Sequence, residues 1–438
     1  MFKEFKNTLP LAIPLILSNI TQMLLHLTDS AMVGYLGHIE LAASSFVNNV
    51  VIIPQVIGSG ITLALSPLVA FALGQNDSNK ISKYLYNSIW LSLIVGLILV
   101  VSLFLLTPML GQMGQQAEVA AMAPKYYQLM AASLFPMMVF LMLKQFSDGL
   151  EYTKTGMVIS LVALPVNAFL CWLFIFGNLG LPKLGLAGAG LATLITRTLQ
   201  AIVMFIIVMK HPIYKPYLRK FSEAVKISKA NIKEILSIGI PSSLQLTMES
   251  AAFAISGILI GHLGAVSQAA HQIALNCASL TFMASVGLST AASIRVSNAF
   301  GHGNKPLMRA IGKSVLLGGL VYSIICIVVF VAFKNQLPLI FNHEPEVVAL
   351  AAGLLLLAAI FQISDATQAI GVGLLRGMKD VKKPTLYVMI AYWIIGIPLG
   401  YILTFKMNFG VQGMWIGFVT GLTISSLFLN TRFLRKTK

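Results

Sequence analysis

Long apolar segments separated by short polar connections follow one another along the whole chain of 438 residues. A helix needs about 20 mostly apolar residues to cross a bilayer, and twelve segments reach that length. They span approximately residues 8–36, 43–73, 85–110, 120–147, 155–177, 186–209, 235–261, 267–299, 311–334, 346–375, 384–405 and 411–431. The segments are too long for the alternating strands of an outer-membrane barrel. The pattern therefore predicts an all-α polytopic membrane protein with twelve transmembrane helices.

Composition supports this class. The chain is 57% hydrophobic and 10% charged, whereas a soluble domain carries about 25% charged residues. All three cysteines (Cys171, Cys277 and Cys326) lie in apolar segments, which predicts neither a disulfide framework nor a metal site built from cysteines. The sequence contains no phosphate-binding loop and no nucleophile motif. We therefore expect neither an enzyme nor an ATP-driven pump, and no cofactor.

The net charge of +16 is concentrated on alternate connections between the segments. The connection 210–234 carries Lys210, Lys215, Arg219, Lys220, Lys226, Lys229 and Lys233. By the positive-inside rule this side of the membrane is cytoplasmic, and so are both termini. The charge is thus an orientation signal, and we expect no nucleic-acid partner. The sequence predicts a multi-pass protein of a bacterial or archaeal plasma membrane, embedded in the lipid bilayer, and we expect a monomer.

The two halves of the chain, 1–209 and 235–438, are related in sequence across the linker 210–234. Positions of the first half recur in the second at one constant offset, among them Pro14, Gly34, Leu36, Gly37, Ala42, Ala43 and Gly74, which reappear as Pro241, Gly261, Leu263, Gly264, Ala269, Ala270 and Gly301. Further on, Gly185 and Gly188 match Gly410 and Gly413 at a slightly smaller offset. Because each half has an even number of spans, the repeat is parallel, and its axis lies along the membrane normal. The sequence thus predicts two six-helix lobes related by a pseudo-two-fold axis, as in transporters that work by alternating access.

Three acids lie well inside predicted spans: Asp29, Glu249 and Asp365. A carboxylate there opposes insertion by ~2.5–3.5 kcal/mol, so such residues usually serve a function. Each could instead be a structural polar group satisfied by neighbouring helices. As functional groups they would bind the coupling ion and the positive part of a substrate. The sequence leaves open whether that ion is H⁺ or Na⁺, with Na⁺ held at Glu249 and Asp365.

Other polar residues in the spans have simpler explanations. Arg197 is best interpreted as a structural partner for an acid or for backbone carbonyls. His271, Gln272 and Asn276 lie within about one and a half helical turns and could present a polar face to a cleft. For His271 alone, a hydrogen bond between packed helices is the simpler interpretation. Lys144, Asp148 and Arg295 lie near span ends, where snorkelling to the interface would explain them.

Three stretches together resemble the multidrug and toxic compound extrusion (MATE) family, in its NorM-like branch. They are IPLILSNITQMLLHLTDSAMVGYLG, ESAAFAISGILIGHLG followed by AAHQIALN, and ISDATQAIGVGLLRGMKD. The resemblance covers nearly the whole chain and implies two six-helix lobes around a cleft. It implies that Glu249 and Asp365 are cation-coupling acids, and that Asp29 and Asn167 belong to a polar site in the N-terminal lobe. Cys171 and Phe361 depart from the family pattern, because each replaces a residue that could ligate a cation.

Two functions remain open at this point. The resemblance implies an antiporter, coupled to Na⁺ or H⁺, that exports small amphipathic and mostly cationic compounds. The alternative is a dedicated metabolite exporter or a lipid-precursor flippase of the same superfamily. The number of spans and the acidic residues favour the first function.

Overall fold

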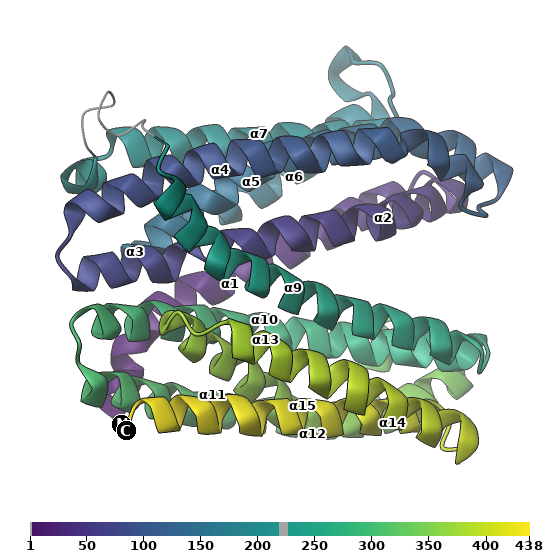
Figure 1. Cartoon of the computed structure of the whole chain (residues 1–438). Helices are drawn as coiled ribbons and strands as arrows, with labels where there is room; N and C mark the ends of the chain where they lie inside the picture. Colours follow the sequence, from purple (N-terminus) through teal and green to yellow (C-terminus); the bar gives the residue numbers. More distant parts are fainter. Residues whose placement is uncertain (1, 219–226) are drawn as a thin grey trace. The chain divides into compact units, whose positions relative to one another are not determined.

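The computed structural model describes residues 2–218 and 227–438, and those residues form helices and short connections without a strand (Figure 1). Part of the predicted basic linker, including Arg219, Lys220 and Lys226, lies outside the described residues. Within the described part, a 3₁₀ helix covers Pro212–Tyr217 and the next long helix begins at Lys229.

The prediction of twelve spanning helices is confirmed within the described residues, where twelve helical stretches are long and apolar enough to cross a membrane. The first half contains α1 (Phe2–Gly34), α2 (His38–Thr62), α3 (Leu65–Gly74), α4 (Ser78–Leu106), α5 (Ala117–Gly149), α6 (Thr153–Phe176) and α7 (Leu186–Lys210). The second half contains α9 (Lys229–Gly261), α10 (Ala265–Gly301), α11 (Lys305–Ala332), α12 (Pro345–Gly377), α13 (Lys382–Met389), α14 (Ile397–Tyr401) and α15 (Val411–Lys436). The second span comprises α2 and α3, and the eleventh combines α13 and α14 with two π-helical stretches, Ile390–Gly396 and Ile402–Lys406.

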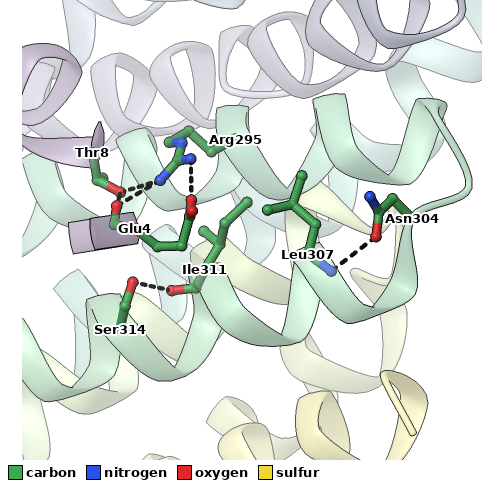
Figure 2. A network of polar contacts seen from close by, with 7 residues as sticks. All are labelled: Glu4, Thr8, Arg295, Asn304, Leu307, Ile311 and Ser314. Carbon is green, nitrogen blue, oxygen red and sulfur yellow. Dashed lines mark hydrogen bonds and ion pairs between the residues drawn. The ribbon is translucent and has the colours of Figure 1, made fainter. Parts of the chain in front are cut away.

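The repeat seen in the sequence recurs in the local backbone geometry. Gly37 precedes α2 with φ +151°, and its counterpart Gly264 precedes α10 with φ +103°. These are conformations that a side chain strongly disfavours, which explains why both positions are glycine. Asp77 caps α4 by accepting a bond from Lys80 N at 2.9 Å. Asn304, the equivalent position in the second half, caps α11 in the same way, accepting from Leu307 N at 3.0 Å (Figure 2).

Contacts divide the chain into two compact units, Leu17–Ser243 on one side and Met1–Ile16 with Leu244–Lys438 on the other. These limits differ from the predicted lobes 1–209 and 235–438, because the first helix of each half divides its contacts between units. The division falls after Ile16 in α1 and after Ser243 in α9, which are equivalent positions of the repeat. The beginning of each half therefore packs with the helices of the other half.

A glycine marks the close approach in each unit. At Gly60 of α2, an added Cβ would lie 2.7 Å from Ser243 N of α9. At Gly287 of α10, an added Cβ would lie 2.8 Å from Ile16 N of α1. Gly60 and Gly287 are again equivalent positions of the repeat, and so are their partners. Only a residue without a side chain lets the two helix backbones meet this closely.

Hydrogen bonds and an ion pair connect the beginning of α1 to α10. The Arg295 guanidinium donates to the Glu4 carboxylate at 2.6 Å, to Glu4 O at 2.7 Å and to Thr8 Oγ1 at 2.8 Å (Figure 2). The Arg295 side chain is only 14% exposed. The snorkelling interpretation of Arg295 is therefore wrong, because its charge is paired inside the protein and is not extended towards water.

The same correction applies to Lys144 and Asp148 at the end of α5. Lys144 Nζ donates to Asp148 Oδ2 at 3.0 Å, and the two side chains are 7% and 0% exposed. They form a buried ion pair between successive turns of one helix. A spacing of four residues allows such a pair. Because this end of α5 is buried, the two side chains pair with each other and do not reach water.

Candidate functional site

The Glu249 carboxylate is the centre of a polar cluster built by α9 and α12. Gln245, one turn earlier on α9, donates its amide to Glu249 Oε1 at 3.1 Å. Gln368 of α12 donates to the same oxygen, also at 3.1 Å. Both glutamines are buried, whereas Glu249 is partly exposed. The carboxylate is thus held by two neutral donors, one from its own helix and one from α12.

Two charged groups of α12 face the same cluster. Asp365 is 6% exposed, and its charge interacts with that of Glu249. Arg376 is 7% exposed and also interacts with Glu249. Arg376 lies in the last turn of α12, which continues to Gly377 and buries it. The cluster therefore has two acids and one base, and can carry a net negative charge.

Aromatic side chains border this cluster, beginning one turn beyond Glu249. The ring of Phe253 lies 5.9 Å from that of Tyr392 and 6.4 Å from that of Phe361. Tyr392 itself interacts electrostatically with both Glu249 and Asp365. Tyr392 and Phe361 are 2% and 3% exposed, so these rings form a packed aromatic wall beside the two acids.

The three polar residues predicted together on α10 separate in the structure. His271 is 2% exposed, accepts a hydrogen bond from Trp415 Nε1 at 3.2 Å and packs edge-on against that ring. Gln272 is exposed and donates to Asn276 Oδ1 at 3.0 Å. His271 thus joins α10 to α15, as its simpler interpretation predicted, while Gln272 and Asn276 form a pair on another face of the helix.

A second acidic cluster lies in the other unit around Asp29. Thr193 of α7 donates to Asp29 Oδ2 at 3.2 Å, and the Cys171 thiol of α6 donates to Oδ1 at 3.4 Å. Asn167, one turn before Cys171, is fully buried, and its Nδ2 has no hydrogen-bond partner within the described residues. The Cys171 thiol also lies 3.9 Å from Asn167 Oδ1 and so links Asn167 to Asp29, the two residues that the resemblance had associated. Cys171 occupies the expected position but offers a weak donor in place of an oxygen ligand.

A cavity of about 310 Å³ opens beside Asp29. Its lining includes His26, Asn48, Gln55 and Tyr126, all in the same unit. Arg197, which also interacts electrostatically with Asp29, donates to Ser133 Oγ at 2.8 Å. This cavity is large enough for several waters or a small organic group.

Sequence reasoning missed several members of the two clusters. Gln245 could have been found, because it stands four residues before Glu249 on one helix face. Gln368 stands three residues after Asp365 and shares its side of α12 by the same rule. Thr193, His26 and Tyr126 carry no comparable signal, since only the packing of separate helices brings them to Asp29.

Within the described residues, twelve helices are long and apolar enough to cross a membrane, and three of them carry Asp29, Glu249 and Asp365 inside the span. Acids inside apolar spans are typical of membrane transporters. Comparison with known proteins agrees. The family model described as MatE matches the chain twice, at residues 14–173 and 241–402. The two matches begin at Pro14 and Pro241, which are equivalent positions of the internal repeat, and this confirms the repeat. The chain belongs to the MATE family of transporters, and its bacterial relatives place it among multi-pass proteins of the bacterial inner membrane.

The relatives are similar over nearly their whole length. A probable multidrug resistance protein NorM of Rhizobium meliloti (strain 1021) is 34% identical over 440 residues, covering 99% of this chain and 93% of the relative. The multidrug resistance protein MdtK of Yersinia pseudotuberculosis (serotype O:1b, strain IP 31758) is 32% identical, covering 99% of this chain and 96% of the relative.

Solved structures share the fold at lower sequence identity. The eukaryotic MATE transporter AtDTX14 superposes with a TM-score of 0.89 at 23% identity, covering 100% of this chain and 98% of that chain. An outward-facing MATE transporter superposes with a TM-score of 0.91 at 20% identity, covering 99% and 96%. The all-helical fold is therefore that of the MATE transporters.

Proposed function

We propose that the protein is a multidrug exporter that uses an inward flow of Na⁺ or H⁺ to drive amphipathic, mostly cationic compounds out of the cell. The two halves, 1–209 and 235–438, would alternate access to the two sides of the membrane. The multidrug resistance proteins among its relatives support the substrate class. The observation that carries the coupling is the Glu249 cluster, where two acids share a largely buried environment with one arginine.

The donor set around Glu249 is suited to a small cation. Gln368 uses its amide nitrogen on Glu249, while its Oε1 is buried without a hydrogen-bond partner in the described part of the chain. A cation at this position would receive oxygen ligands from Glu249, Asp365 and Gln368, the hard donors that Na⁺ prefers. A proton on either carboxylate would relieve the same repulsion between Glu249 and Asp365. Both ions therefore fit, and a transport measurement has to choose between them.

The proposal includes the orientation of the chain in the membrane and its oligomeric state. We propose that both termini are cytoplasmic, and the basic connections support this through the positive-inside rule. We propose that the transporter acts as a monomer. Asp29 and Asn167 would form a second polar site within one half, with the adjacent cavity available to part of a substrate.

The test is efflux of ethidium from purified protein in liposomes. An inward Na⁺ gradient at equal pH is compared with a proton gradient in the absence of Na⁺. We expect Glu249→Gln and Asp365→Asn each to reduce gradient-driven efflux at least tenfold, because neither amide can bind and release the coupling cation as the carboxylate does. Glu346→Gln, which alters an exposed acid in the first turn of α12, is the matched control and should transport normally.

The outcomes separate the alternatives. A Na⁺ response that is lost in Glu249→Gln assigns Na⁺ to this cluster, and a response to the proton gradient alone assigns H⁺. Normal efflux by both acid variants would refute the coupling role. Well-folded protein that responds to neither gradient would favour a dedicated metabolite exporter or a lipid-precursor flippase.

A further inference from the structure

An open groove of about 520 Å³ lies between α13 and α15, outside both acidic clusters. Its lining is apolar at one end and basic at the other. One end is apolar, with Leu427 and Phe428 of α15 exposed by 61% and 52% and the ring of Tyr387 of α13 lying 5.6 Å from the Phe428 ring. The other end is basic, with Arg432, Arg435 and Lys436. The groove therefore offers an apolar surface and a cationic surface in sequence, as an amphipathic anion requires.

The basic end has more positive charge than the protein neutralises. Asp380 accepts from Arg432 Nε at 2.7 Å and lies 2.7 Å from Lys436 Nζ. Burial acts to raise the pKa of Asp380, but the bonds from these two cations outweigh it and hold that pKa below its usual value. Arg435 is exposed and forms no ion pair within the described ranges. Two cations thus share one carboxylate, and Arg435 is left to bind an anion.

The position of this charge in the membrane identifies the anion. The three cations occupy the last turns of α15, the final spanning helix, where the bilayer core meets the headgroups. The exposed leucine and phenylalanine lie about one to two and a half turns earlier, within the span. A ligand that satisfies both ends needs a phosphate with net negative charge and an acyl chain continuing from it. Basic pockets beside spanning helices recognise anionic lipid headgroups in this way.

We propose that the groove between α13 and α15 is a binding site for an anionic phospholipid, with Arg435 and its two basic neighbours on the phosphate and Leu427 and Phe428 along the acyl chain. Because Asp380 positions Arg432 and Lys436, it preorganises the headgroup end of this site. The site belongs to one unit of the chain and does not depend on the transport cycle proposed above.

The test is native mass spectrometry of the purified full-length protein, titrated with dioleoyl phosphatidylglycerol or dioleoyl phosphatidylcholine, which differ only in the headgroup. We expect the first molecule of phosphatidylglycerol to bind at least fivefold more tightly than phosphatidylcholine. Arg435→Gln should weaken phosphatidylglycerol binding about fivefold, the contribution of one basic residue near an anionic surface, and leave phosphatidylcholine unchanged. Arg435→Lys should retain the preference.

The control is Lys305→Gln, which removes one exposed charge at the start of α11, away from the groove. Thermal unfolding of each variant checks that the fold is intact. Equal loss of phosphatidylglycerol in Arg435→Gln and Lys305→Gln would overturn the proposal, because the preference would then reflect net charge only. Equal binding of the two lipids by the native protein would overturn it too. Displacement of phosphatidylglycerol by millimolar inorganic phosphate would show a phosphate site in place of a lipid site.

Discussion

The close approach of α1 to α10 and of α9 to α2 depends on two glycines, and replacing either by alanine measures how much that packing contributes. A Cβ at position 287 would lie 2.8 Å from Ile16 N and 2.9 Å from Ile16 Cα. At position 60 it would lie 2.7 Å from Ser243 N. Ordinary contacts of this kind need about 3.5 Å or more, so the helices would have to separate by several tenths of an ångström.

The size of the effect follows from two opposing terms. Overpacking a tight contact costs about 1–3 kcal/mol, and the upper part of that range applies because backbone atoms of Ile16 and Ser243, which cannot rotate away, are among the opposing atoms. Alanine in a helix interior contributes about 1 kcal/mol in its favour over glycine. We therefore expect Gly287→Ala and Gly60→Ala each to destabilise the protein by about 1–2 kcal/mol.

The matched control is Gly257→Ala in α9. Nothing lies within 4 Å of a Cβ at this position, so only the helix term remains and the variant should gain about 1 kcal/mol. The assay is the thermal midpoint of the detergent-solubilised protein at one fixed scan rate, since unfolding of such proteins is often irreversible. The expected order is Gly257→Ala above native, and Gly287→Ala and Gly60→Ala below it. A thermal midpoint for either tight-contact variant equal to that of Gly257→Ala would refute the packing argument.

Two further predictions concern charges that the fold buries. Asp148→Asn should destabilise the protein by about 3–5 kcal/mol, because it leaves Lys144 buried without its partner. Adding Lys144→Met should recover part of that loss in the same thermal assay. A double variant that is less stable than Asp148→Asn alone would contradict this. Asp380, whose pKa is held down by its two basic partners despite burial, contributes stability above about pH 4 that is lost as the pH falls through its lowered folded-state pKa. Melting curves between about pH 3 and 7 should therefore show a smaller acid loss in Asp380→Asn, and an identical pH profile would exclude the contribution.

Sequence reasoning went furthest where local chemistry decides the outcome. Span positions follow from the length of the apolar runs, and a turn that needs positive φ follows from its glycine, as Gly264 illustrates. The acids Glu249 and Asp365 were recognisable because a carboxylate in an apolar span is too unfavourable to keep without a partner or a function. The constant offset between matching positions also identified the repeat without any knowledge of contacts.

Sequence reasoning failed where the outcome depends on which helices meet. Lys144 and Arg295 were expected to extend towards water, but each is paired inside the protein. In each case the residue type and its distance from a span end were compatible with both outcomes.

The sequence by itself predicted the twelve spans, the duplicated organisation and the acids that were candidates for a function. These features depend on local properties, namely the length of an apolar segment, the backbone conformation and the free energy of placing a charge in an apolar span. Tertiary structure alone decided the partners of those acids, the pairing of His271 with Trp415 and the packing of each half's first helix with the other half. Those outcomes depend on side chains that are far apart in sequence, and a partner is defined only after the helices have packed.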